Sequence, residues 1–288
     1  MRIIDDIKLQ YKIGGIANKF IYWNVGCFLV SLVFYKFKEG LFDFPVWLAL
    51  YANPKTTIIF PWTLFTYAFL HDGFWHLFWN MLVLNFYSRL FTTFFTNKQY
   101  VGLYFLSAIF SGVVFVILYP FFGNSLYPVV GASGAIMGIL VATTVYQPLM
   151  EIRLFLIGNI KLWHLTGVIL LLDFMSVGLG NSGGEIVHLS AAFFGFLYIK
   201  LLQNGTDLSV IVSKFIDFFI NLFSKKEKIV FKKVHVNPKK TIKPQESKIV
   251  IKDENQQQID AILDKISKSG YDSLNQSEKE FLFKAGGN

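Results

Sequence analysis

Charged residues are scarce in this chain, and cysteine is almost absent. Only 16% of the 288 residues are charged, and Cys27 is the single cysteine. One cysteine excludes an intrachain disulfide framework, and the low charge excludes the composition of an ordinary soluble domain. Apolar residues dominate instead, because 53% of the chain is hydrophobic and 32 residues are phenylalanine. The composition therefore indicates a polytopic membrane protein.

The net charge of +8 does not indicate a nucleic-acid partner. Basic residues gather near the ends of apolar runs, where they report membrane orientation. The C-terminal tail also lacks the interleaved aromatic and basic residues of a nucleic-acid surface. No small-residue cleavage site follows the first apolar run, so we expect that run to be an uncleaved insertion signal. We therefore expect the chain to contact a lipid bilayer and not a nucleic acid.

Six segments are apolar and long enough, or nearly so, to cross a membrane, which takes roughly 20 residues. They are residues 20–35, 74–95, 100–122, 132–150, 162–180 and 186–202. A long connection between the first two, residues 36–73, is rich in aromatic residues and proline, as is typical of a loop in the membrane interface. Lys and Arg at the start, in most alternate links and after the last span favour cytoplasmic positions for both termini.

Composition divides the chain into five parts. Residues 1–19 form a cytoplasmic or interfacial lead, 20–204 the six-span domain, 205–224 an amphipathic helix on the inner leaflet, 225–254 a basic flexible linker, and 255–288 a small helical hairpin. The hairpin is predicted from four apolar residues at helical spacing and from an Asn–Glu pair that can cap its second helix: Ile259, Ile262, Leu263, Ile266, Asn275 and Glu278. We expect it to dock or to bind an unidentified cytoplasmic partner.

Polar side chains interrupt three of the apolar runs. His76 and Asn80 lie one turn apart in the second run, Ser133 lies in Gly131–Gly134 (GASG) at the start of the fourth, and His188 begins the sixth. Such groups are costly at bilayer depth, so several of them in separate spans indicate a working site. A serine, two histidines and an asparagine are the groups that acyl transfer uses as nucleophile, base and oxyanion donors.

Each motif also has a structural interpretation. Gly134 and Gly138 form a GxxxG pattern, which lets another backbone approach closely. Small residues follow His188 on one face of its helix, so we expect the fourth span to pack tightly there. His76 and Asn80, taken alone, are more typical of a polar clasp between helices.

A metal site from His71, His76 and His188 is a further alternative. No HExxH motif is present and no carboxylate is placed to complete such a site. We therefore expect neither a metal nor a cofactor. Asp173 is an acid inside the fifth span for which the sequence names no partner.

Taken together, these motifs resemble those of the rhomboid family of intramembrane serine proteases. The stretch 69–81, FLHDGFWHLFWNM, is similar to the family's His…HxxxN span, Gly131–Gly134 to its GxSG, and VHLSAAFFG at 187–195 to its AHxxGxxxG. The match in order and spacing covers residues 20–202. The segment after Asp253 resembles a helical module carried by some bacterial rhomboid-like chains.

The resemblance implies an all-α membrane protein, a six-helix bundle with a Ser133–His188 dyad in a bacterial inner membrane. It also implies an oxyanion site from His76, Asn80 and the Ser133 N–H, with Gly131 nearby. Substrates would be the transmembrane segments of membrane proteins. Three positions depart from the family pattern, namely Thr63, Met137 and Ala191.

Two other functions compete with proteolysis. A non-catalytic rhomboid-like protein that binds membrane helices would share the fold, because fold does not decide function. Such a binder has no need for a nucleophile and a base, which favours the protease. A small transporter is disfavoured, because the ionisable groups cluster at one depth and do not line a path through the membrane.

Overall fold

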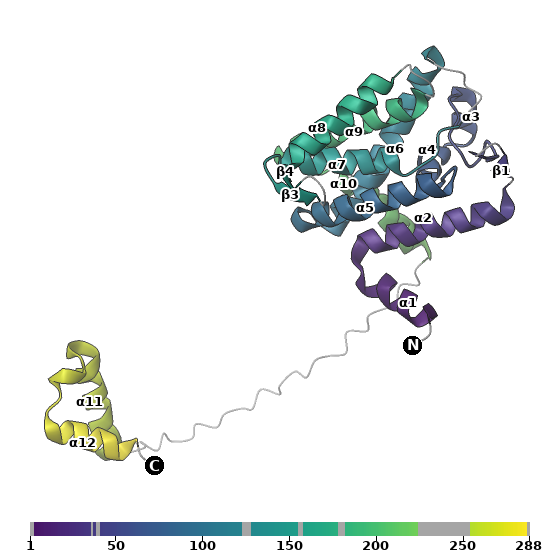
Figure 1. Ribbon diagram of the computed structural model, residues 1–288. Helices are drawn as coiled ribbons and strands as arrows, with labels where there is room; N and C mark the ends of the chain where they lie inside the picture. The colour runs from purple at the N-terminus through teal and green to yellow at the C-terminus, as the bar shows by residue number, and fades with distance from the viewer. Residues whose placement is uncertain are drawn as a thin grey trace. The chain divides into compact units, whose positions relative to one another are not determined.

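The computed structural model describes residues 3–35, 37–38, 41–122, 128–154, 158–177, 182–223 and 254–286. The chain forms two compact units, Met1–Lys226 and Glu227–Asn288, and each is described by itself (Figure 1). The predicted linker 225–254 lies outside the described residues except for Glu254.

The first unit is almost wholly helical among its described residues. Its elements are α1 (Ile3–Ile13), α2 (Gly15–Phe34), β1 (Phe37–Lys38), β2 (Leu41–Phe42), α3 (Pro54–Ile59), α4 (Thr63–Thr66), η1 (Tyr67–Phe69), α5 (Phe74–Phe94), α6 (Asn97–Leu118), η2 (Tyr119–Phe121), α7 (Ser133–Tyr146), β3 (Glu151–Leu154), β4 (Gly158–Lys161), α8 (Leu162–Ser176), α9 (Ser182–Gln203) and α10 (Ser209–Phe223).

Helix α7 lies at the centre of this unit. It contacts α5, α6, α8 and α9, and Figure 1 shows it between them. Eleven of its fourteen residues are buried. A helix that is apolar all round and covered on every side has no amphipathic face, so its position is set by close packing against its neighbours.

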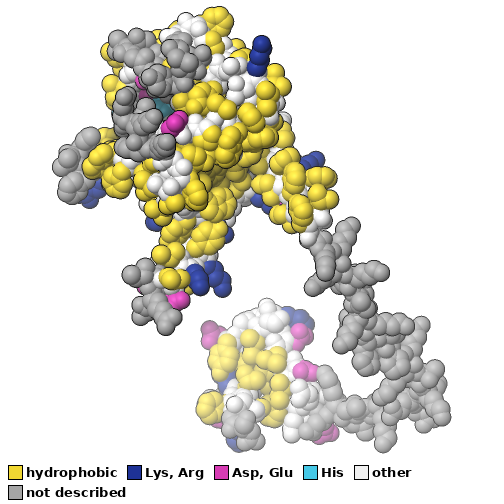
Figure 2. All heavy atoms as spheres, turned by 90° about the vertical axis from the view of Figure 1, so that its right-hand side faces the viewer, with side chains coloured by type: hydrophobic (Ala, Val, Ile, Leu, Met, Phe, Trp, Pro, Cys, Tyr) yellow, Lys and Arg dark blue, Asp and Glu magenta, His cyan; other side chains and the backbone are white. Residues whose placement is uncertain are grey.

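Each of the six apolar segments contains a helix, which confirms the helical prediction for all of them. Among the described residues, three helices are by length and composition able to cross a membrane: Gly15–Phe34, Asn97–Phe121 and Gly183–Gln203. Helices α7 and α8 are apolar but shorter. On the face drawn in Figure 2, hydrophobic side chains cover most of the described surface of this unit. The chain is thus a membrane protein, and the count of six spans stays a prediction.

Several boundaries differ from the sequence prediction. The predicted lead contains α1, and α2 begins at Gly15 and not at residue 20, because Gly15 adopts a positive φ of 74° that separates the two helices. The fourth helix ends at Tyr146 and the fifth at Ser176. The chain is mostly helical, as predicted, and among the described residues two short antiparallel hairpins, β1–β2 and β3–β4, interrupt the helices.

The hairpin β3–β4 connects α7 to α8, where only a basic link was expected. Glu151 pairs with Lys161 and Leu154 with Gly158. Residues 151–154 alternate between polar and apolar side chains, with Ile152 buried. This period of two is the pattern of a strand with one face covered.

The long connection before α5 is held to itself by side-chain hydrogen bonds. The indole of Trp62 donates to the Trp47 carbonyl at 2.6 Å, and Thr66 donates to the Leu48 carbonyl at 2.7 Å. Thr63, which departs from the family pattern, is buried and donates to the Phe60 carbonyl at 2.8 Å. These hydrogen bonds therefore anchor the connection although Thr63 departs from the family pattern.

Helix α10 joins the bundle at its first turn only. Ser209 is buried against α6, where a Cβ on Gly102 would come within 2.6 Å of the Ser209 Cα. The Asp207 carboxylate accepts hydrogen bonds from the Gln99 amide and the Tyr198 hydroxyl. Beyond this turn the apolar side chains are exposed, with Phe215 at 65%. An exposed apolar face of this kind suits the inner-leaflet position predicted for the helix.

The second unit is a pair of helices, α11 (Glu254–Ser269) and α12 (Gln276–Ala285), joined by η3 (Tyr271–Ser273). The predicted cap is confirmed, because the Asn275 side chain accepts from the Glu278 N–H at 2.9 Å and the Glu278 carboxylate accepts from the Asn275 N–H at 2.8 Å. Lys265 of α11 bonds the same carboxylate.

Candidate active site

Ser133 is the first residue of α7. The first backbone bond of the helix runs from the Ile136 N–H to the Ala132 carbonyl. The N–H groups of Ser133, Gly134 and Ala135 consequently have no acceptor within the helix. They lie at the positive end of the helix dipole, where negative charge is stabilised. These N–H groups lie next to the Ser133 hydroxyl and could donate hydrogen bonds to an oxyanion formed there.

The segment before Ser133 is held by backbone hydrogen bonds to the long connection. The Val129 N–H donates to the Leu50 carbonyl at 2.8 Å, and the Gly131 N–H donates to the Tyr67 carbonyl at 3.0 Å. Non-helical backbone at membrane depth is tolerated where protein or a cavity surrounds it. These bonds satisfy that requirement and fix the approach to the serine.

Helices α7 and α9 pack backbone against backbone. A Cβ on Gly195 would lie 3.0 Å from the Gly138 carbonyl carbon and 3.1 Å from its Cα, and closer still to its oxygen. A Cβ on Gly138 would likewise lie 3.4 Å from the Ala191 carbonyl oxygen of α9. The predicted tight approach of these two helices is confirmed. Ala191 is fully buried at this contact, so the extra methyl group that departs from the family pattern is accommodated.

Ser133, His76 and His188 line one cavity of about 170 Å³. Asp72, Gly183 and Gly184 complete its polar side, and its apolar wall consists of Phe115, Tyr119, Pro128, Val129 and Val130. The predicted nucleophile, the predicted base and one predicted oxyanion donor are therefore brought together from α7, α9 and α5. No hydrogen bond joins Ser133 to His188 among the described residues, and such bonds often tighten only when substrate is bound.

His76 is paired with Asp72, which the sequence interpretation overlooked. Its Nδ1 hydrogen-bonds the Asp72 carboxylate, and its Nε2 faces Gly131, where a Cβ would lie 2.8 Å away. Gly131 has a φ of 127°, so both its backbone and its neighbour require glycine. Burial raises the pKa of Asp72, but the hydrogen bond and charge of His76 outweigh it, and the net pKa lies below the usual value. The four-residue spacing was the signal available in the sequence.

His188 is paired with Asp173 of α8. Their Nδ1 and Oδ1 atoms lie 3.2 Å apart, and the two side chains are 24% and 19% exposed. Asp173, which had no partner in the sequence interpretation, thus contacts the predicted base. Fifteen residues and a helix connection separate the two, so no local spacing rule indicated the contact.

Two predicted oxyanion residues are engaged elsewhere in this structure. The Asn80 amide donates to the His76 carbonyl at 2.9 Å, and Asn80 is not among the residues that line the cavity. The Asn80 Oδ1 is buried and has no hydrogen-bond partner among the described residues. The Gly131 N–H is occupied by Tyr67, so Gly131 serves the site by its missing side chain.

A metal is not suggested by the described residues. They contain no group of three or more His, Cys, Asp or Glu placed to hold an ion. His71, the third histidine of the metal alternative, is fully buried, and its ring lies 5.2 Å from that of His76.

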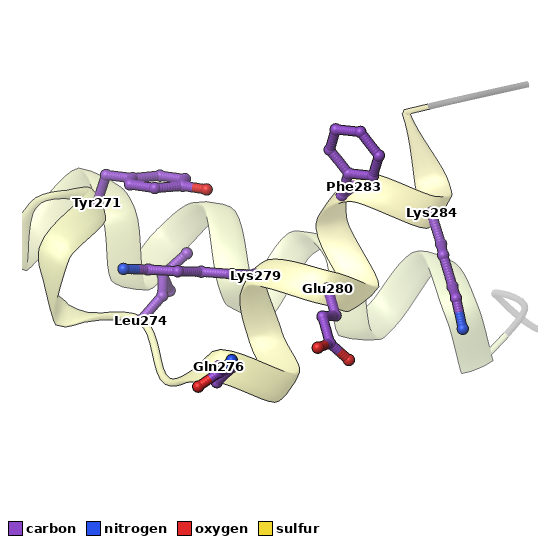
Figure 3. Close-up of a pocket in the computed structure, with 7 residues that line it drawn as sticks. All are labelled: Tyr271, Leu274, Gln276, Lys279, Glu280, Phe283 and Lys284. Atoms are coloured by element: carbon purple, nitrogen blue, oxygen red, sulfur yellow. The ribbon is translucent and has the colours of Figure 1, made fainter.

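A larger hollow of about 690 Å³ lies on the second unit (Figure 3). Figure 3 shows the Lys279 side chain extending beneath the ring of Tyr271, and its Nζ is 5.1 Å from the ring centroid. The described residues that line this hollow include no histidine, serine or cysteine. It lacks the nucleophile and base that the cavity of the first unit has.

Comparison with protein families agrees with this geometry. The Rhomboid domain model matches residues 61–204, half of the chain, and this range holds every residue of the cavity. The chain belongs to the rhomboid family. A second model, a family of unknown function (DUF6576), matches residues 250–284 and so covers the α11–α12 unit. No curated protein matches the chain. The rhomboid family includes non-catalytic members, so proteolysis must be argued from the site.

Proposed function

We propose that this rhomboid is an intramembrane serine endopeptidase that cuts transmembrane or membrane-adjacent segments of membrane proteins. The observation that supports the proposal most is the shared cavity of Ser133, His188 and His76. A protein that only binds helices has no need for a hydroxyl at a helix N-terminus facing the same space as two histidines. Fold membership alone does not separate the two functions.

In the proposed reaction His188 is the general base. Its Nδ1 is beside Asp173, so Nε2 is the nitrogen left to take the proton of the Ser133 hydroxyl. Ser133 attacks the scissile carbonyl and forms a tetrahedral intermediate. His188 then protonates the leaving amine, and a water molecule that enters the cavity hydrolyses the acyl-enzyme by the same route.

The negative oxygen of the intermediate would be stabilised by the free N–H groups at the start of α7 and by His76. A donor of this kind is worth about 2.7–4 kcal/mol in acyl transfer. His76 can donate through Nε2 only when both of its nitrogens carry protons, and Asp72 provides the negative charge that such an imidazolium requires. Asn80 would have to release the His76 carbonyl before it could donate.

Substrate and location follow from the orientation that the basic residues favour. With both termini cytoplasmic, the cavity opens toward the outer face of a bacterial inner membrane. A helical peptide bond is shielded from attack, so the substrate helix must unwind near its outer end. Glycine or proline near the cut would favour that unwinding. No cofactor takes part.

The test uses the full chain in liposomes with a single-span substrate. Ser133→Ala and His188→Ala should each abolish cleavage. Ser190→Ala and His164→Ala are matched controls, because Ser190 donates to the Ile186 carbonyl and His164 is exposed on α8. Both controls should cleave at the wild-type rate.

A fluorophosphonate probe separates proteolysis from helix binding. The probe should label Ser133 in the wild type, and labelling should be lost in Ser133→Ala and in His188→Ala. A wild-type protein that neither cleaves nor reacts would reject the protease proposal and favour the non-catalytic helix-binding alternative.

A further inference from the structure

Asp173 is the acid of α8 that meets the predicted base of α9. Its Oδ1 lies 3.2 Å from His188 Nδ1, and its Oδ2 is buried with no hydrogen-bond partner among the described residues. His188 is thus the residue to which this carboxylate is directed. A carboxylate in a membrane helix is costly, so its presence calls for a role that an apolar side chain would not fill.

Two other acids belong to this region: Asp72, which lines the same cavity as His188 and is paired with His76, and Glu185. Glu185 lies one turn earlier than His188 on α9, and its Oε2 is buried with no hydrogen-bond partner in the part of the chain that the structure describes. No ion pair or hydrogen bond links it to His188 among the described residues. Among the described residues, Asp173 is thus the acid that contacts the His188 ring.

We propose that Asp173 is a positioning residue for His188, which would make the site a Ser–His–Asp arrangement distributed over α7, α9 and α8. The carboxylate accepts a hydrogen bond from Nδ1–H, so the neutral ring keeps its proton on Nδ1 and presents an unprotonated Nε2 to Ser133. When His188 takes the serine proton, the carboxylate lies beside the resulting imidazolium. Asp173 itself stays ionised throughout, and no proton is transferred to it.

This inference rests on the proposed function, and its test separates positioning from mere stabilisation. The variants are Asp173→Asn, which keeps the shape and removes the charge, and Asp173→Glu, which keeps the charge. Glu185→Gln is the matched control, because it neutralises an acid that does not contact the ring. Each full-length variant is assayed in liposomes, and its active sites are counted with a fluorophosphonate, so that kcat is expressed per reactive serine.

Loss of the equivalent acid in soluble triads lowers kcat by about 10⁴, and we expect a loss of at least ten-fold per active site for Asp173→Asn. The number of reactive serines and KM should stay within about two-fold, and the rate of labelling should fall in parallel with kcat. Asp173→Glu should recover part of the rate, and Glu185→Gln should keep it.

The contrary outcomes are distinct. If Asp173→Asn has fewer reactive serines but an unchanged kcat per serine, the pair only stabilises the fold and the positioning role is overturned. If Glu185→Gln loses as much activity as Asp173→Asn, general negative charge matters and not the contact. If the wild type neither cleaves nor labels, the proposed function fails and this role falls with it.

Discussion

Replacing Gly195 with alanine tests whether the backbone contact between α7 and α9 sets the geometry of the dyad. The new Cβ would lie 3.0 Å from the Gly138 carbonyl carbon. Ordinary carbon contacts need about 3.5–4.0 Å, so the helices must separate by roughly 0.5–1 Å. The neighbour is backbone, which cannot rotate away. His188 lies two turns from Gly195 on the same helix, so the displacement reaches the base.

The expected cost has two parts. Overpacking of this kind destabilises by about 1–3 kcal/mol, while alanine is better than glycine in a helix by about 1 kcal/mol. We therefore expect Gly195→Ala to lose up to about 2 kcal/mol of stability. A displacement of about 1 Å at the reacting groups can lower a catalysed rate by as much as 10², so kcat should fall well beyond the loss of folded protein.

Gly26→Ala is the matched control. Gly26 also lies inside a long apolar helix, α2, but a Cβ there has nothing within 4 Å. Thermal unfolding in detergent and kcat per reactive serine are measured for both variants. Gly26→Ala should be as active as the wild type and more stable by up to about 1 kcal/mol, because alanine is the better helix former and its Cβ meets no neighbour. If Gly195→Ala behaves in the same way, the two helices do not depend on this contact and our account of the packing is wrong.

Two further predictions concern a buried histidine and the second unit. Burial, together with the charge of nearby His76, lowers the pKa of His71 from 6.5 to about 3. Between pH 6.5 and pH 3, His71 is therefore protonated in the unfolded chain and neutral in the folded chain. The free energy of unfolding should therefore fall by about 1.4 kcal/mol per pH unit as the pH drops below 6.5. Unfolding curves at pH 7 and pH 5 should show a smaller loss in His71→Phe than in the wild type. An equal loss in the wild type and the variant would refute this prediction. Asn275→Ala should destabilise the α11–α12 unit by about 1 kcal/mol through loss of the cap without changing proteolysis, which circular dichroism of the isolated segment and the liposome assay of the full chain would check.

The six central helices and the close approach of α9 to α7 were predictable, because short-range patterns in the sequence indicate both. Apolar runs of sufficient length predicted all six central helices, and the small residues of α9 predicted its approach to Gly138. The Asn275 cap was equally local. The β3–β4 hairpin also had a local signal, the alternation around Ile152, but Arg153 and Lys161 were interpreted only as markers of membrane orientation. The alternation of polar and apolar residues was therefore sufficient to predict the strand, but it was not considered because the basic residues suggested a simple link.

The pairing of Asp173 with His188 could not be predicted in the same way. A four-residue spacing places two side chains on one helix face, and this rule would have indicated Asp72 with His76. Asp173 meets His188 only because α8 and α9 pack with their facing ends in register. No periodicity in the sequence encodes that register.

The two histidines of the cavity have the same kind of partner but need opposite protonation states. Asp72 and Asp173 each meet an Nδ1, which leaves both Nε2 atoms free of these carboxylates. His188 must be neutral at Nε2 to accept the serine proton, whereas His76 must carry a proton there to donate to the oxyanion. Two groups of one type with opposed roles require environments that differ. Here the two carboxylates differ in origin: Asp72 lies four residues before His76 in the chain, whereas Asp173 reaches His188 from a second helix. The division between donor and base in this site thus depends on helix packing as much as on residue identity.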